Sequence, residues 1–543
     1  MKFARCAGFV VAFAAMVSAQ VPSPPGQSPP SHADVGKGEV VTAKQQDELR
    51  QQAYAAENKQ QFAVAADAFL ALRKADPQRV EWLVAAGRCL GRSGRFREAV
   101  DLLDAGRKEF PGVIEVPAML ARTFLLQAET DRGVLHPEIL SADAAQLAEE
   151  VLLATPDDPE CRLMLAQARY LLGEWEEAVK HAEDAVRRHP QRAGAHVLLG
   201  RIAGDRLREQ LRRFQTQNPK GQDAADQVGA IDQQRQAAIR SYSKAAELDP
   251  TRAHPHVALG EISWLDLRFE AARTHFANAL AIDPDVSLNH DLLCQGLDWQ
   301  TRASFYESVR KRYAVGTSSR VEKVATLQFH EGRARFDGSN WNEAAKCFSA
   351  ALAGNPAGTN ARYYLFLCAY HRGHLDGAEQ HATSYAALGA PAFADVIRAL
   401  PGDRRGEVGA IVQFLGDRAY GQKRIDASRD INHVIACLKD SADAWNNHAF
   451  LCRETARFDD ALSSYQHALE KEPDSPQLLN DTAVILQYHL VSADNKAKAK
   501  GMYERALQAA AKQLADARIT GTARERAEKA KVDAQENLRA LGK

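Results

Sequence analysis

The sequence predicts an all-α fold, a solenoid made by stacking antiparallel pairs of helices. Two observations predict it. Ala, Leu, Glu, Gln and Arg dominate the body of the 543-residue chain, and these residues favour helix. The sequence also repeats with a period of 34 residues, which is typical of solenoids. A chain of this length is too long for one compact core, but a stacked array adds its core unit by unit.

Eight prolines mark the repeat, and each follows a helix-like segment. Three of the seven successive spacings between them are 34 residues, and the other four are longer, which indicates local insertions. The prolines are Pro77, Pro111, Pro156, Pro190, Pro250, Pro284, Pro356 and Pro473. Because a proline disfavours the helical conformation at the residue before it, each one predicts the end of a helix.

Other positions keep a fixed distance from these prolines. Alanine stands twelve residues before all eight: Ala65, Ala99, Ala144, Ala178, Ala238, Ala272, Ala344 and Ala461. An aromatic residue stands fifteen before six of them: Phe62, Phe96, Trp175, Phe269, Trp341 and Phe458. A small residue recurs in each first helix: Ala53, Gly87, Ala121, Ala166, Gly200, Gly260, Gly332 and Ala449. Small residues let two helices approach closely, so each unit is predicted to be a tightly packed helix pair.

Two units carry insertions of 11 and 26 residues, which fall after the first helix and before the second. In the longer insertion Leu207, Leu211 and Phe214 continue a helical spacing, and a loop is expected near Asn218–Gly221. This pattern predicts a protruding helical hairpin over 204–235. The hairpin either contacts a partner or simply lengthens the two helices, and the sequence favours neither alternative.

The pattern resembles the tetratricopeptide repeat, whose signature is W-x2-L-G-x2-Y, then A-x3-F, then P. Residues 254–285 match it through Leu259, Gly260, Ala272, Phe276, Ala279 and Pro284. Residues 443–474 match it through Trp445, Ala449, Ala461, Tyr465, Ala468 and Pro473. Weaker units are expected at about 286–320, 359–391 and 408–440, and a last one begins near Ser475. The resemblance covers about residues 44–510 and implies a right-handed superhelix of about eleven or twelve helix pairs.

The N-terminus has a different character from the repeats. MKFAR is followed by a twelve-residue apolar run and by small residues up to Ala19, which is the form of a secretory signal peptide. The run is shorter than the roughly 20 residues that span a bilayer, so we expect cleavage and no integral span in the mature chain. The chain is therefore expected to be exported, to the periplasm or the exterior.

The predicted organisation has five parts. They are a signal peptide at 1–19, a Pro/Ser-rich linker at 20–43, an N-terminal array at 44–300 that includes the hairpin, a C-terminal array at 301–510 with degenerate repeats, and capping helices at 511–543.

The resemblance implies that the first helices line a concave surface. Positions next to the small residues then predict a partner-binding set: Arg88, Gln167, Arg201, Glu261, Arg333, Asn446 and Asn480. The arginines suit carboxylates and the asparagines suit a peptide backbone. The alternative, favoured for any single position, is a solvated side chain. The Lys and Asn set of the family's chaperone-binding clamp is missing, and two asparagines do not make the asparagine ladder of its sugar-transferring enzymes.

Motifs for catalysis and cofactor binding are missing from the sequence. It holds no G-x-S-x-G, H-E-x-x-H, phosphate loop or dinucleotide fingerprint, so we expect no enzyme activity and no cofactor. The formal net charge of −1 gives no basic face for nucleic acid. Cys368, His371, His374 and His381 are the one set that resembles a metal site, but turn histidines are common and we expect no metal. Seven scattered cysteines remain after signal removal; most are expected to be small core residues, and the sequence leaves open whether any of them form a disulfide.

These observations predict a non-catalytic, exported scaffold or adaptor that binds a protein or peptide segment in its concave groove. Two alternatives stay open at this point. One is a structural envelope component that associates with itself. The other is a regulatory arm for an enzyme of polysaccharide or cell-wall metabolism.

Overall fold

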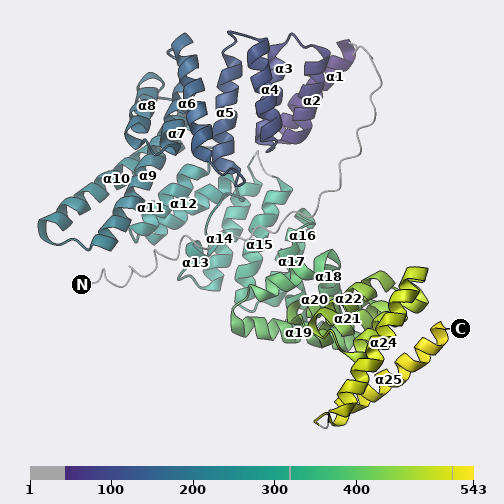
Figure 1. Cartoon of the computed structure of the whole chain (residues 1–543). Coiled ribbons are helices and arrows are strands. Elements are labelled where there is room, and N and C mark those ends of the chain that lie inside the picture. The colour runs from purple at the N-terminus through teal and green to yellow at the C-terminus, as the bar shows by residue number, and fades with distance from the viewer. Residues whose placement is uncertain (1–42, 317–319, 517, 543) are drawn as a thin grey trace. The chain divides into compact units, whose positions relative to one another are not determined.

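The computed structural model describes residues 43–316, 320–516 and 518–542, and every regular element in them is a helix (Figure 1). The chain divides into two compact units, Met1–Leu293 and Cys294–Lys543. The predicted signal peptide and nearly all of the predicted linker lie outside the described residues. The predicted boundary after residue 300 falls inside a helix, Trp299–Ala314, a few residues beyond the point at which the two units divide.

The first unit consists of six helix pairs in chain order. They are α1 (Ala43–Asn58) with α2 (Phe62–Ala75), α3 (Val80–Arg92) with α4 (Phe96–Glu109), α5 (Glu115–Thr130) with α6 (Pro137–Ala154), α7 (Pro159–Leu171) with α8 (Trp175–Arg188), α9 (Ala193–Gln217) with α10 (Gly221–Leu248), and α11 (His254–Leu265) with α12 (Phe269–Ile282). The short α13 (His290–Cys294) follows at the division between the units.

The second unit begins with α14 and ends with a single helix. Its helices are α14 (Trp299–Ala314), α15 (Val321–Asp337), α16 (Trp341–Gly354), α17 (Thr359–His371), α18 (Leu375–Arg398), α19 (Gly402–Gly421), α20 (Ile425–Lys439), α21 (Ala442–Glu454), α22 (Phe458–Lys471), α23 (Pro476–Val484), α24 (Ala493–Ala515) and α25 (Gly521–Leu541). A π-helical turn, η3 (Ile485–His489), extends α23. The last predicted segment, 511–543, therefore contains the end of α24 and one further helix.

The prolines of the repeat set the ends of the second helices. All eight of these helices end two residues before their proline, at Ala75, Glu109, Ala154, Arg188, Leu248, Ile282, Gly354 and Lys471. This position follows from the steric conflict between a proline ring and a helical residue before it. The six aromatic residues of the repeat each begin a second helix. The sequence therefore predicts these helix boundaries correctly.

The small residues of the repeat lie where the helices of a pair cross. All eight repeat alanines have no exposed surface, with relative exposures of 0%. A Cβ atom at Gly260 would lie 2.4 Å from the ring of Phe276 on the partner helix. Only glycine leaves room for that ring, which is why the pair can close around it.

Two expectations for the weaker units are wrong. The segment 286–320 is not a regular pair, because α13 is only five residues long and the chain turns at Gly296 with a φ of 76° before α14 begins. Pro391 does not end its unit. The helix is interrupted at Gly389 (φ 161°, ψ 98°), and Pro391 then stands in the first turn of a second helical segment, where a missing N–H costs little.

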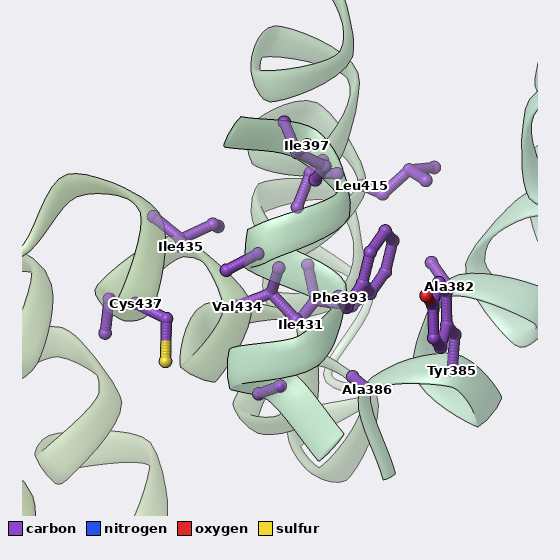
Figure 2. Close-up of a cluster of buried hydrophobic side chains, with 14 of the residues drawn as sticks. Ala382, Tyr385, Ala386, Phe393, Ile397, Leu415, Ile431, Val434, Ile435 and Cys437 are labelled. Atoms are coloured by element: carbon purple, nitrogen blue, oxygen red, sulfur yellow. The ribbon is translucent and has the colours of Figure 1, made fainter. Parts of the chain in front are cut away.

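This second segment of α18 forms part of the core of the second unit (Figure 2). Phe393 is 1% exposed and stacks on Tyr385, with 4.2 Å between ring centroids. Ile397 joins the same cluster as Leu415 and Ile431. The segment after the kink thus packs between the α17–α18 pair and the α19–α20 pair.

Candidate binding face

The first helices of successive pairs lie beside one another in the first unit. α3 contacts α5, α5 contacts α7, and α7 contacts α9. We call the solvent-facing side chains of α1, α3, α5, α7, α9 and α11 the inner face of this unit. Four of the predicted binding residues lie on it: Arg88, Gln167, Arg201 and Glu261.

Arg201 and Gln167 meet at one carboxylate. The Arg201 guanidinium donates to Glu129 Oε1 at 2.6 Å, and the Gln167 amide donates to Oε2 of the same residue at 2.9 Å. Glu129 belongs to α5 and Arg201 to α9, so the ion pair reaches past α7. Arg201 also lies over the ring of Tyr170 at 4.9 Å from its centroid. Three successive first helices are therefore linked through a single glutamate.

Arg88 has a separate partner at the N-terminal end of the inner face. Its Nε and Nη2 atoms donate to the two oxygens of Glu57 at 2.8 and 3.0 Å. This two-point geometry is the strong form of an arginine–carboxylate pair. The hydrogen bonds to Glu57 raise the pKa of Arg88 above its ordinary value, although burial opposes that shift. Arg88 is thus held by its own chain.

The other end of the inner face carries a chain of polar contacts from α7 to α11. The Tyr170 hydroxyl donates to Asp205, and burial followed by this contact raises the pKa of Tyr170 to about 12. Asp205 accepts from Arg208 at 2.6 Å. Arg208 also lies 3.8 Å from the carboxylate of Glu261. Glu261 is therefore connected to α9, but it does not meet Arg201.

The sequence analysis missed the carboxylates and the second arginine of this network. Glu129 and Arg208 both lie eight residues after the small residue of their helix. The predicted position is one residue after it, and seven residues separate the two positions, which is two helical turns on the same face. That spacing is the signal that would have identified them. Glu57 and Asp205 come from other spacings and follow only from the structure.

The predicted residues of the second unit lie in three different settings. Arg333 on α15 acts on Tyr364, whose pKa is raised by burial while the Arg333 charge lowers it. Asn446 on α21 has a buried Oδ1 atom with no hydrogen-bond partner among the described residues. Asn480 is 5% exposed because α25 packs on α23, and its Oδ1 accepts from Asn537 at 3.1 Å. The expectation that Asn480 lines an open groove is therefore wrong.

A buried histidine lies in the interior of the second unit. His448 is 4% exposed, and its Nδ1 lies 2.8 Å from Ser464 Oγ while its Nε2 lies 3.3 Å from Cys452 Sγ. The His433 ring stacks on the His448 ring at 4.4 Å between centroids. Burial, followed by the charges of His433 and Arg429, lowers the pKa of His448 to about 3. His448 is consequently neutral near pH 7.

Two members of the histidine and cysteine set near residue 370 have packing roles. Cys368 has no exposed surface, and the His371 ring stacks on Trp341 at 4.4 Å. In the part of the chain that the structure describes, no three His, Cys, Asp or Glu side chains are placed to hold a metal ion. All seven cysteines after Cys6 are free thiols, and five of them are buried.

Two family models for the tetratricopeptide repeat match the chain, one over residues 50–114 and 329–394 and the other over residues 141–202. The chain is a tetratricopeptide repeat protein. Tetratricopeptide repeats build scaffolds for protein interaction. A comparison with curated protein sequences finds no match.

Many solved structures are similar to this repeat protein. MamA from Desulfovibrio magneticus RS-1 is 16% identical, with 36% of this chain and 97% of that chain covered and a TM-score of 0.26. TTC0263, a thermophilic TPR protein of Thermus thermophilus, is 17% identical, with 45% and 96% covered and a TM-score of 0.24. The human IFIT1 dimer with m7Gppp-AAAA is 14% identical, with 64% and 78% covered and a TM-score of 0.35.

Within residues 43–316, 320–516 and 518–542, the repeat protein has no helix with the length and apolar character needed to cross a bilayer.

Proposed function

We propose that this repeat protein is a non-catalytic scaffold that holds a protein or peptide partner along its inner face. The observation that carries the proposal is the side-by-side arrangement of α3, α5, α7 and α9, which makes one continuous surface from separate repeats. A surface built in this way offers many weak contacts at fixed spacing, and it loses little entropy on binding because the helices are already in place.

The contacts already made by Arg88 and Arg201 suggest how a partner would bind. Each arginine is paired with a glutamate of the chain itself, and those glutamate side chains keep 16% and 22% of their exposure. A carboxylate of the partner would take the place of Glu57 or Glu129, so that one ion pair exchanges for another. Such an exchange contributes selectivity more than affinity. Apolar neighbours such as Val84 and Leu163 would supply the affinity.

The N-terminal signal pattern supports a location outside the cytoplasm, in the periplasm or beyond the cell. The proposal includes no cofactor, no metal and no nucleic acid.

Affinity capture from the extracytoplasmic fraction of the producing cell tests the proposal. The bait is residues 20–543, compared with a variant that carries Arg88→Ala and Arg201→Ala on the inner face. We expect a partner that the parent chain captures and the variant loses by about tenfold or more. The matched control carries Arg107→Ala and Arg187→Ala on second helices, and it should capture the partner as the parent does.

Two results would contradict the proposal. A partner captured equally by the inner-face variant would place binding elsewhere on the molecule. Capture of nothing, together with self-association on a sizing column, would favour a structural component that assembles with itself.

A further inference from the structure

The fifth helix pair projects beyond its neighbours. α9 has 25 residues and α10 has 28, whereas α7 and α8 of the preceding pair have 13 and 14. The added residues extend the pair by roughly 20 Å at 1.5 Å per residue. Figure 1 shows the tip of this hairpin beyond the ends of α8 and α11. A two-helix projection of this length leaves apolar side chains without a third element to cover them.

Apolar side chains follow both helices of the projection. Leu211 and Phe214 on α9 and Ile231 on α10 are only half-buried, and Val228 on α10 is 51% exposed. Their spacing of three residues within each helix places each pair on one side of its helix. In a complete layer of the array such positions are covered by the next pair.

A second apolar feature lies at the base of the projection, in the turn between α11 and α12. Leu265 is 46%, Leu267 is 58% and Phe269 is 38% exposed, and the Trp264 ring contacts Phe269 at 4.6 Å between centroids. We call these four residues the ledge. Arg235 of α10 donates to Asp266 of this turn at 2.7 Å, so the ledge lies against the hairpin where the projection begins.

The backbone of the ledge is unusual among the turns of the array. Leu267 has a φ of 59°, in the left-handed region that disfavours a branched apolar side chain. The corresponding turns of other pairs place glycine, a polar residue or alanine at positive φ: Gly94, Gly173, Gly373, Gln60, Ser339, Lys423 and Ala456. A strained and exposed leucine at such a position indicates a functional surface.

The array itself shows what covers this side of the hairpin. At the base of α9 and α10, Ala203, Ala238 and Tyr242 pack against Leu259 and Ile262 of α11. Arg208 of α9 faces the carboxylate of Glu261, also on α11. α11 ends at Leu265, while α9 and α10 continue past it. The projecting surface is thus a continuation of an interface that a helix already occupies.

The charges on the α9 side of the projection indicate what kind of helix would continue this interface. Residues 205–217 contain four arginines against two carboxylates. Arg212 lies one helical turn beyond Arg208 on the same side of α9 and is 73% exposed, although it contacts Glu209. A partner helix would therefore place a carboxylate beside Arg212, as α11 places Glu261 beside Arg208.

We propose that the hairpin projection and the ledge dock an acidic amphipathic helix of a partner protein, which continues the path of α11. The apolar stripe of that helix packs on Leu211, Val228 and Ile231. Its end rests on Leu265 and Leu267. A carboxylate faces Arg212. Val228 and Ile231 on α10 and Leu267 in the turn lie outside the inner face, whereas Leu211 and Arg212 extend its α9 side.

A synthetic peptide probe tests the inference. The probe is a fluorescein-labelled helix of about 14 residues, which matches the ~20 Å projection, with leucines every three and four residues and glutamates elsewhere. Its control is a peptide of the same composition with the stripe scrambled. Fluorescence anisotropy with residues 20–543 should show binding of the striped peptide at tens of micromolar or tighter and at least about tenfold weaker binding of the scrambled one.

Variants of the chain locate the site. Val228→Asp and Leu267→Asn should each weaken binding at least about tenfold, and asparagine keeps the left-handed turn intact. Val532→Asp changes a valine on α25 with a similar exposure of 52%, and it should bind the probe as the parent does. Equal binding of both peptides, or equal binding by all variants, would overturn the inference.

The same peptide and variants distinguish two other occupants of this surface. Sedimentation velocity that shows a dimer of the chain, dissociated by Val228→Asp, would replace the partner helix with a second copy. Binding of the probe only after residues 20–42 are removed would assign the surface to the chain's own N-terminal segment. Either result would overturn the proposed partner.

Discussion

The two units of the molecule use the same repeat in different ways. In the first unit the first helices stack in regular succession, and charged side chains link them across the solvent-facing side, as Glu129 links α5, α7 and α9. In the second unit the α18 segment after Gly389 inserts between pairs, and aromatic and histidine rings fill the interior. Among the described residues, buried polar side chains are more numerous in the second unit, where they include Glu331, Glu379 and His448.

The largest difference in stability between the two units should come from a substitution in the α18 segment after Gly389. Phe393→Ala removes a ring that is 1% exposed and stacked on Tyr385, so we expect a loss of about 3–5 kcal/mol in the free energy of unfolding of that unit. Hydrogen exchange during urea unfolding would report the units separately. The first unit should keep its protection.

Phe414→Ala is the matched control in the same unit. Its ring is 44% exposed, so the variant should lose less than about 1 kcal/mol. Equal losses for the two variants would show that the inserted segment is not part of the packing core.

Low pH should produce a smaller difference in stability between the two units. The folded pKa of His448 is about 3, below the ordinary value of 6.5, so the unfolded state binds a proton more readily between these values. The second unit should therefore lose stability as the pH falls below about 6.5, by roughly 2 kcal/mol at pH 5. Urea unfolding followed at pH 7 and pH 5 measures this loss.

The groups around the histidine pair contribute to that pH dependence in both directions. Burial lowers the pKa of His433 below its ordinary value; Asp460 on α22 and Asp430 on α20 oppose this shift, and His467 adds to it. Arg429 on α20 lowers the pKa of His448. His448→Gln keeps a hydrogen-bonding side chain without the titrating ring, and it should flatten the decline in the second unit. An unchanged decline would assign it to carboxylates.

The smallest effect should fall on the first unit. Glu129→Gln removes the charge shared by Arg201 and Gln167, and the partly exposed pair contributes on the order of 0.5–1 kcal/mol at low salt. The difference from the parent should disappear near 1 M salt because the interaction is screened. The control is Glu150→Gln, which breaks the ion pair with Arg107 between α4 and α6. This variant should lose as little stability, and its partner binding should be unchanged.

Local signals in the sequence were enough for most helix boundaries. A proline two residues after a helix acts through its immediate neighbour, so Pro111 or Pro473 needs no tertiary context to be interpreted. The extent of the unit expected at 359–391 could not be predicted in this way, because the chain continues past Pro391 as helix after a break at Gly389 and packs Phe393 against Phe366. The π-helical turn at 485–489 had no comparable signal.

The proposed binding face was less accessible to sequence reasoning. The helical spacing placed Arg88 and Arg201 on the correct helices, but it gave no partner for them. Glu129 lies 72 residues from Arg201, and the two meet only because three first helices stack at the observed spacing. Asn480 was misplaced for a similar reason, since α25 covers it from more than fifty residues along the chain.

The order of the helix pairs also bears on how the chain folds. Because each pair packs mainly against the pairs next to it in sequence, the contacts within each unit are of low contact order. A chain of this kind gains native contacts as each helix pair is completed, without waiting for a distant segment. During synthesis the α1–α2 pair can accordingly fold first and provide a surface on which α3 packs, long before α12 has been synthesised.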